Sequence, residues 1–305
     1  MRFFDLHCDT IYIRKPLRAK GNAHVFLEAG SGLSPWCQTF AVYVPDEIRG
    51  EAAKIYYEDS VAWFRQELLE NSDRITLCAT GAELKETTET GRCAAILAVE
   101  NASALGGDIT YLDKMFNDGV QMITITWNGV NELGCGNVSG EKAGLTTFGK
   151  DVLLKMKRLG MAADVSHLNH AGFWDVIESG VPVVASHSNA DAVWQHPRSL
   201  NDEQIKALIA REGLMGLTFV KMFLGDGEDT GRQAFLRHLT HVLELGGENM
   251  LAIGSDFDGA TMHPELDGIQ YVQSLYQFLA DQNIDKHVLD KLFYLNAFNF
   301  FTERK

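Results

Sequence analysis

Several short apolar runs of the sequence end in side chains that can bind a metal ion or carry a proton. The run at residues 3–7 leads into the segment DLHCD, and the runs at 162–166 and 181–186 each lead into a Ser-His pair. Two further runs, at 94–99 and 251–254, lead into acidic residues. Imidazole and carboxylate groups are ligands of Zn²⁺ and also carry protons in enzymes. The side chains in question are His7, Asp9, Glu100, His167, His187, Asp256 and Asp258.

The spacing of the first pair predicts that its members act together. Side chains two positions apart on a strand share a face, so His7 and Asp9 can point the same way while Cys8 points away, into the core. A single histidine at a strand end is more often a structural hydrogen-bonding group than a ligand. The repetition of the pattern at several strand ends nevertheless favours a joint metal site. We interpret Asp258, which directly precedes Gly259, as a turn residue.

A cluster of such groups requires a cation. Carboxylates and imidazoles brought together in a partly dry pocket repel one another or stay unpaired unless a positive charge compensates them. Three histidines, one aspartate and one glutamate suit Zn²⁺, and two ions that share a carboxylate could hold a hydroxide and polarise a carbonyl. The sequence therefore predicts a dinuclear metal site whose ligands lie far apart in the chain.

The elements that must position these groups follow from the apolar runs. Short, continuously apolar runs are typical of strands covered on both faces, as in parallel sheets, and amphipathic segments separate most of them. We predict an α/β fold, a (β/α)8 TIM-like barrel in a single domain over residues 1–305, in which the strands' carboxyl ends meet at one mouth. An open doubly wound sheet has the same local pattern and is the alternative. The expected strands lie at residues 3–7, 39–43, 94–99, 121–126, 162–166, 181–186, 215–220 and 251–254.

Composition argues against several classes of protein. Asp and Glu number 41 against 27 Lys and Arg, and the net charge of −14 argues against binding nucleic acid or an anionic membrane. The five cysteines are scattered without a CxxC pair, which is typical of a reducing compartment. The segment MRFFDLHCDT lacks the apolar run of a signal peptide, and no run is long enough to span a membrane. We therefore expect a cytoplasmic protein.

Longer segments of the chain match a known family in their order. They are DLHCD at 5–9, QTFAVYVP at 38–45, AVENASAL at 98–105, MITITWNGVNELG at 122–134, ADVSHLN at 163–169, PVVASHSNA at 182–190, HPRSLNDEQI at 196–205 and AIGSDFDG at 252–259. In these segments the chain resembles the membrane dipeptidase (renal dipeptidase) family, the M19 metallopeptidases, and looks like a cytoplasmic member of bacterial type. Any one segment is a weak signal, but the ordered set covers almost the whole chain. The family fold is a (β/α)8 barrel, in agreement with the predicted strands.

The resemblance implies a role for each of the five predicted ligands. His7 and Asp9 would bind one zinc ion, and His167 and His187 would bind the second. Glu100 would bridge the two Zn²⁺ ions, which are the expected cofactors. A hydroxide that bridges the ions would attack the peptide carbonyl.

Further residues match the family's substrate site. Asp256 would carry the proton to the scissile nitrogen, so that Asp256 and Glu100 are the predicted catalytic residues. Arg198 would grip the terminal carboxylate of a dipeptide with its forked guanidinium, although the residue alone is more simply a surface arginine beside a helix. Tyr43 would line the substrate site, or else be a core aromatic residue. Trp127 stands where mammalian members have a histidine thought to contact the scissile carbonyl oxygen, and an indole donates one hydrogen bond but cannot titrate.

These features predict a dinuclear zinc dipeptidase that hydrolyses the peptide bond of small dipeptides, with L,D-dipeptides among the candidate substrates. The nearest alternative, which Trp127 keeps open, is a metal-dependent amidohydrolase acting on a non-peptide amide. A non-catalytic metal-binding barrel is a third interpretation, and Asp256 argues against it because a sensor needs no proton carrier. We expect no nucleic-acid or membrane partner, while a homodimer stays open.

Overall fold

Parallel strands pair around a closed ring. In the computed structural model, which describes residues 1–18, 23–227 and 230–303, the strands form one sheet in the order β2-β1-β9-β8-β7-β6-β5-β4-β3. Strand β2 also pairs with β4, from Trp36↔Cys93 to Tyr43↔Glu100, and this pairing closes the ring. The pairings between neighbouring strands are parallel. The predicted barrel is therefore confirmed, and the open doubly wound sheet is wrong.

One strand of the sheet was not predicted. Strand β3 is three residues long and lies beside the first part of β4, up to the point where β5 begins to pair with β4 at Leu97. So short a segment carries no periodic signal in the sequence. The strands are β1 (Phe3–Cys8), β2 (Trp36–Tyr43), β3 (Ile75–Leu77), β4 (Cys93–Glu100), β5 (Val120–Thr124), β6 (Ala162–Asp164), β7 (Val183–Ala185), β8 (Leu214–Leu217) and β9 (Leu251–Ile253).

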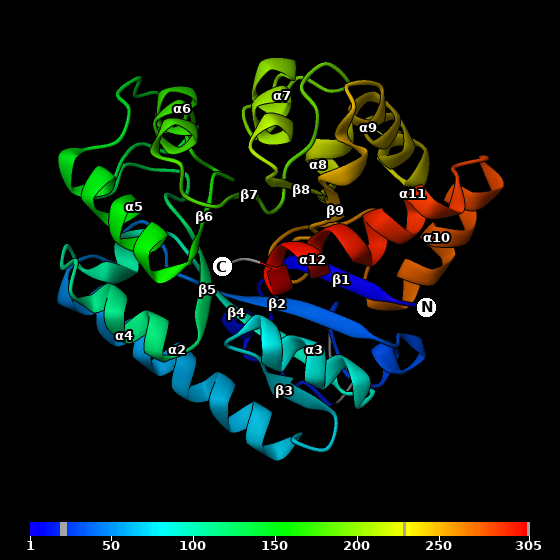
Figure 1. The fold of residues 1–305 in the computed structure, drawn as a ribbon, viewed down its shortest axis with the longest axis horizontal. Coiled ribbons are helices and arrows are strands. Elements are labelled where there is room, and N and C mark those ends of the chain that lie inside the picture. Colours follow the sequence, from blue (N-terminus) through cyan, green and yellow to red (C-terminus); the bar gives the residue numbers. More distant parts are fainter. Residues whose placement is uncertain (19–22, 228–229, 304–305) are drawn as a thin grey trace.

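Helices follow most of the strands and cover the outside of the barrel (Figure 1). Their starts are marked by polar caps: Thr146 accepts a hydrogen bond from the Gly149 N–H at α5, and Asn201 forms a capping box with Gln204 at α7. Among the helices described, none is long and apolar enough to cross a lipid bilayer. The helices are α1 (Thr10–Ile13), α2 (Glu51–Glu70), α3 (Gly81–Glu89), α4 (Tyr111–Asn117), α5 (Thr147–Leu159), α6 (His170–Ser179), α7 (Asp202–Ala210), α8 (Lys221–Leu224), α9 (Arg232–Glu244), α10 (Val272–Asp281), α11 (Lys286–Asp290) and α12 (Asn296–Glu303), with short turns η1 (Ala29–Gly32), η2 (Ala102–Leu105), η3 (Gly247–Asn249), η4 (Ile269–Tyr271) and η5 (Lys291–Leu295).

The last helical segment closes one end of the barrel interior. Inward-pointing strand residues such as Phe4 form an apolar cluster with Tyr294, Ala297 and Phe301 of η5 and α12. The rings of Phe4 and Phe301 stack with their centroids 5.5 Å apart. Because Phe4 lies near the start of β1, this plug fills the amino-terminal end of the barrel. The carboxyl-terminal end of the strands is left for a site, as in other barrels of this type.

Near the carboxyl-terminal end of the barrel, two glycines allow neighbouring strands to approach the backbone of Ser186 closely. A Cβ atom added at Gly216, in β8, or at Gly254, just after β9, would overlap the carbonyl oxygen of Ser186. That oxygen belongs to the backbone, so it cannot move aside by a change of rotamer. The segment that carries His187 therefore depends on the absence of a side chain at both positions.

We expect Gly254→Ala to lower the free energy of unfolding by about 1–3 kcal/mol, the usual cost of overpacking a buried site. Gly32→Ala is the control, because a Cβ atom at Gly32 meets no other atom within 4 Å. We expect it to change the stability by less than about 0.5 kcal/mol, as is usual for surface positions. Urea denaturation of both variants and the parent measures the difference, and equal stabilities would contradict the role assigned to Gly254.

Candidate metal centre

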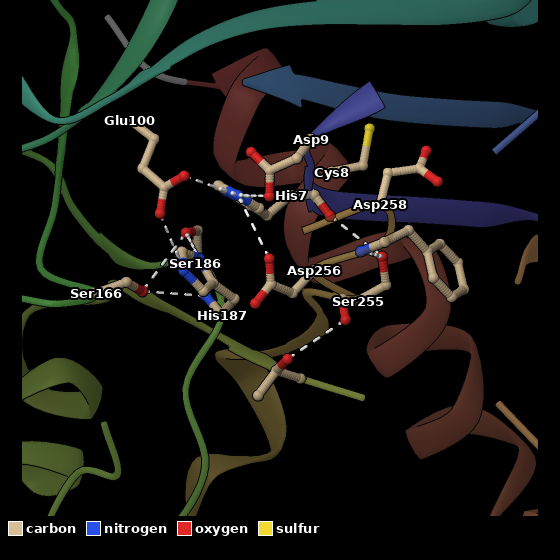
Figure 2. Close-up of polar contacts among 12 residues, drawn as sticks. His7, Cys8, Asp9, Glu100, Ser166, Ser186, His187, Ser255, Asp256 and Asp258 are labelled. Carbon is tan, nitrogen blue, oxygen red and sulfur yellow. Dashed lines mark hydrogen bonds and ion pairs between the residues drawn. The ribbon is translucent and has the colours of Figure 1, made fainter. Parts of the chain in front are cut away.

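The five predicted ligands lie together at the carboxyl-terminal end of the barrel. His7 belongs to β1 and Asp9 follows it, Glu100 is the last residue of β4, and His167 and His187 lie shortly after β6 and β7. All five side chains are buried. Figure 2 shows four of them, those of His7, Asp9, Glu100 and His187, directed toward one small region. The strand ends thus bring together five side chains that lie far apart in the sequence.

Glu100 lies between the other ligands. Its Oε1 is 3.0 Å from His167 Nε2 and 3.6 Å from His187 Nε2. Its Oε2 is turned the other way, 3.7 Å from His7 Nε2, and Asp9 Oδ2 is 3.4 Å from that same nitrogen. One oxygen of the Glu100 carboxylate therefore faces His167 and His187, and the other oxygen faces His7.

His167 and His187 turn the same ring atom toward each other. His167 Nδ1 lies 3.0 Å from Asn128 Oδ1, and His187 Nδ1 lies 2.7 Å from Ser186 Oγ. An amide oxygen only accepts hydrogen bonds, so the hydrogen of His167 is on Nδ1 and its Nε2 carries a lone pair. The two Nε2 atoms are 3.0 Å apart. Burial lowers the pKa of both rings, which keeps them neutral, as a metal-binding imidazole must be.

His7 is the centre of the second group. Among the described residues, neither of its ring nitrogens has a hydrogen-bond partner, and the same is true of Asp9 Oδ1, although these atoms are buried. Burial alone would lower the pKa of His7, but Asp9, Glu100 and Asp256 raise it to about 10. Burial also raises the pKa of Glu100 well above its usual range. Unpaired buried acceptors and crowded carboxylates are costly by themselves, and a bound cation compensates both.

The donor atoms are also close enough for coordination. Among the described residues, three groups of possible ligand atoms each lie within 4.8 Å of one another: those of Glu100, His167 and His187, those of His7, Asp9 and Asp256, and those of His7, Asp164 and His187. Imidazole nitrogens together with carboxylate oxygens suit Zn²⁺. The residues present therefore fit a pair of metal ions.

Asp256 lies beside the second group. It follows β9, and its N–H donates a hydrogen bond to the His7 carbonyl oxygen at 3.2 Å. Its Oδ1 is 3.8 Å from His7 Nε2, and burial raises the pKa of its carboxyl to about 7.

Asp258 has a structural role. It accepts hydrogen bonds from Thr10 Oγ1 and the His24 N–H, both at 2.6 Å, and so ties these two segments to its own loop. Cys8 is buried in the core, as expected.

A cavity of about 550 Å³ opens onto these groups. Tyr43 and Trp127 form part of its wall, with ring centroids 5.0 Å apart, and Tyr12 packs against Tyr43 with centroids 5.1 Å apart. Tyr43 therefore faces the cavity, and the alternative of a core aromatic is wrong. Phe223 lines the cavity as well. Asp9, Glu100 and His167 thus line a pocket whose wall includes several aromatic rings.

Arg198 is buried at the wall of this cavity and is not a surface residue. Arg198 is 3% exposed, and its Nη2 donates a hydrogen bond to the His187 carbonyl oxygen at 3.2 Å. Its guanidinium lies 5.4 Å from the ring centre of Phe223. Within the described part of the chain, its Nε has no hydrogen-bond partner and the side chain forms no ion pair. Burial lowers the pKa of the Arg198 guanidinium, and the charges of Asp256, Glu100 and Asp164 partly offset this effect, but none of these three carboxylates forms an ion pair with it. An anionic group of a bound molecule would supply that ion pair.

The sequence did not reveal the residues that hold the two facing histidines. Asn128 directly follows Trp127, and Ser186 directly precedes His187 in the Ser-His pair, which was the available signal. Asp164 was missed as well. Its oxygens come close to two of the ligands, but they accept hydrogen bonds from two hydroxyl groups and two N–H groups, so they are not free to bind a metal.

Comparison with known proteins places this fold and site in a family. The sequence profile described as "Membrane dipeptidase (Peptidase family M19)" matches residues 17–304. An uncharacterised protein in the pqqA 5′ region of Klebsiella pneumoniae is 33% identical over 261 residues, which are 82% of this chain and 96% of that protein. Dipeptidase verJ of Clonostachys rogersoniana is 30% identical over 230 residues, which are 74% of this chain but 59% of that protein.

A solved structure shows the same arrangement of the chain. A metallopeptidase from Rhodobacter sphaeroides, liganded with a phosphinate mimic of the dipeptide L-Ala-D-Ala, superimposes with a TM-score of 0.92 at 27% identity. The superposition covers 100% of this chain and 99% of that one. The chain therefore belongs to the membrane dipeptidase family, peptidase family M19, and is a hydrolase of the metallopeptidase class.

Proposed function

We propose that the protein is a dinuclear zinc dipeptidase. One observation above all supports this proposal: buried donors from five residues converge on one region, and the two oxygens of Glu100 face different histidine groups. Family membership supports a metallopeptidase that acts on dipeptides. The donor set, three imidazoles with two carboxylates, favours zinc over Mg²⁺ or Ca²⁺, which prefer oxygen ligands.

Each zinc ion would have its own pair of ligands and share a fifth. His7 and Asp9 would hold one ion, His167 and His187 would hold the other, and Glu100 would contact both. When bound, zinc lowers the pKa of water, so that a nucleophile forms at neutral pH, and it polarises the carbonyl group of the scissile bond. The chain supplies two neutral imidazoles, those of His167 and His187, and a site that is largely shielded from bulk water.

Asp256 would move the proton. Its carboxyl lines the cavity beside His7 and has a pKa raised by burial to about 7, so both of its protonation states are accessible at neutral pH. Such a group can accept a proton from the attacking water and deliver it to the departing amine nitrogen. Its carboxyl lies beside the two ligands of the first ion, 3.8 Å from His7 and hydrogen-bonded to Asp9, and so is close to the water that would attack.

Arg198 would select the substrate. A guanidinium binds a carboxylate through two parallel hydrogen bonds, and this one is buried at the cavity wall without an ion-pair partner in the described residues. A substrate must then present a free carboxylate close to the scissile bond. Dipeptides satisfy that condition at their single peptide bond, and longer peptides satisfy it only at their C-terminal bond.

L,D-dipeptides are among the candidate substrates. The Rhodobacter sphaeroides relative is liganded with a mimic of L-Ala-D-Ala, which supports this class of substrate for a homologous cavity. Trp127 favours a second candidate function, the hydrolysis of a non-peptide amide, because its indole adds an apolar face beside Tyr43 and offers a single hydrogen-bond donor.

The zinc-loaded protein should hydrolyse dipeptides, and it should hydrolyse their C-terminal amides far more slowly. Arg198→Ala should raise KM for the free dipeptides about 10- to 100-fold, because it removes hydrogen bonds to a charged group worth about 1.5–3 kcal/mol. The slow hydrolysis of the amides should change little. Chromatography of the released amino acids, over a panel with L and D residues at the second position, measures each rate.

Three other outcomes of this panel would contradict the proposal or support another function. An unchanged preference of Arg198→Ala for free dipeptides would remove Arg198 from substrate binding. Two bound metals with hydrolysis of N-acyl or cyclic amides, but not of dipeptides, would establish the alternative amidohydrolase. Two bound metals without hydrolysis of any amide would establish a binding protein.

Glu100→Ala should reduce the zinc content from two ions to fewer than one per chain, because this carboxylate serves both ions. Asp9→Ala is the comparison, since it removes a carboxylate of similar burial that serves one ion and should therefore leave about one ion bound. Elemental analysis after dialysis gives the metal content of each variant. Two tightly held zinc ions in Glu100→Ala would show that Glu100 is not the bridging ligand.

Asp256→Asn should keep both zinc ions and lower kcat about 10²- to 10⁴-fold, the usual contribution of a general acid and base. The amide has nearly the shape of the carboxyl but cannot exchange a proton in this range of pH. Steady-state rates and metal content are measured on the same preparation. A kcat near that of the parent would exclude Asp256 from proton transfer.

A further inference from the structure

Two buried aspartates hold neighbouring strands in the same way. Asp164, at the end of β6, accepts the Ser186 N–H with Oδ1 at 2.9 Å and the Ser186 hydroxyl with Oδ2 at 2.6 Å. Asp5, in β1, accepts the Ser255 N–H with Oδ1 at 2.8 Å and the Ser255 hydroxyl with Oδ2 at 2.6 Å. Each serine directly precedes a residue of the proposed site, His187 or Asp256. We call these two arrangements the Asp–Ser clamps.

The two clamps differ in what else the serine hydroxyl touches. Ser186 Oγ lies 2.7 Å from the Nδ1 atom of the neighbouring His187 ring. Ser255 Oγ instead contacts backbone, the carbonyl oxygen of His7 and the N–H of Phe257, both at 3.1 Å. Figure 2 shows Ser186 and Ser166 beside His187, with Ser255 on the other side of the site near Asp256. Of these two clamps, the Asp164–Ser186 clamp is the one that reaches an imidazole.

The hydrogens around Asp164 can be assigned from its partners. Its carboxylate faces two backbone N–H groups, those of Ser166 and Ser186, and two hydroxyls, those of Thr124 and Ser186. A carboxylate surrounded by four donors is an acceptor, so the single hydrogen of the Ser186 hydroxyl points to Asp164. The oxygen of that hydroxyl can then only accept from His187. The hydrogen of the neutral His187 ring is therefore on Nδ1.

We propose that Asp164 and Ser186 are positioning residues that fix the tautomer of His187. With its hydrogen held on Nδ1, the ring turns the lone pair of Nε2 toward Glu100 and toward His167 Nε2, so that two lone pairs face each other at 3.0 Å, an arrangement suited to a cation and not to a hydrogen bond. Partners of this kind orient a metal-binding imidazole and make it a better ligand. Asn128 does the same for His167 through its amide oxygen. The significance for metal binding rests on the proposed function, but the tautomer is a property of the chain itself.

The tautomer is measured on the metal-free protein by long-range ¹H–¹⁵N NMR of the histidine rings, in which protonated and unprotonated nitrogens are distinguished. A His187→Gln variant identifies the signals of His187. We expect the parent protein to carry the His187 hydrogen on Nδ1. In Ser186→Ala, which removes the acceptor, we expect a mixture of the two tautomers. In Ser255→Ala, which breaks the same bond to a buried aspartate without touching the ring, we expect the His187 signals of the parent.

Zinc titration gives the second readout. Ser186→Ala should bind zinc about 10- to 100-fold more weakly, the usual effect of losing a partner of a metal ligand. Ser186→Thr keeps the hydroxyl and should restore both the Nδ1–H tautomer and most of the affinity. Thermal unfolding of Ser186→Ala and Ser255→Ala should be similar, because each variant loses a buried hydroxyl that donates to an aspartate at 2.6 Å and has further polar partners.

Two results would overturn the proposal. One is a parent protein whose metal-free His187 carries its hydrogen on Nε2. The other is a Ser186→Ala variant with unchanged His187 signals and unchanged zinc affinity. Neither result depends on dipeptide hydrolysis, so an inactive protein with the Nδ1–H tautomer would count against the proposed function alone.

Discussion

Imidazoles and carboxylates can share a buried pocket only if positive charge compensates them, and the carboxyl end of this barrel is organised around that requirement. Glu100 faces histidine groups on both sides, and His7 has no hydrogen-bond partner for either ring nitrogen among the described residues. The pKa of His7 is raised because three carboxylates surround it. A proton relieves this crowding in part, and a pair of divalent cations would relieve it fully.

Rigid surroundings keep the ligands at the right separation. The carboxyl ends of parallel strands place them, and the Asp–Ser clamps tie β6 to the segment after β7 and β1 to the segment after β9. The close approach at Gly216 and Gly254 sets the position of the Ser186 backbone from the opposite side. The plug formed by η5 and α12 fills the other end of the barrel. The cluster of candidate ligands is thus supported from several directions by groups outside it.

The sequence predicted the parts of the structure that leave a local pattern. The i, i+2 spacing of His7 and Asp9 and the apolar runs that end in Ser-His pairs were sufficient to predict the barrel and its cluster of ligands. Strand β3 was missed because three residues show no period. Neither the burial of Arg198 nor the bond between Asn128 and His167 could be predicted, because both arise from segments that meet only in space. Hydrogen-bond partners of ligands are decided by tertiary packing, and spacing does not encode them.

The Asp5–Ser255 clamp joins β1, the first strand of the chain, to the segment after β9, the last strand. Its partners are 250 positions apart, so this contact forms only when nearly the whole chain is available, and loop closure over such a distance is slow. A chain still open at this seam could already bring His167 and His187 together, because β6 and β7 are neighbours in sequence. It would lack Asp256 beside His7. On the proposed mechanism, hydrolysis therefore requires β1 and β9 to be paired, and metal binding at His167 and His187 alone would not be sufficient for it.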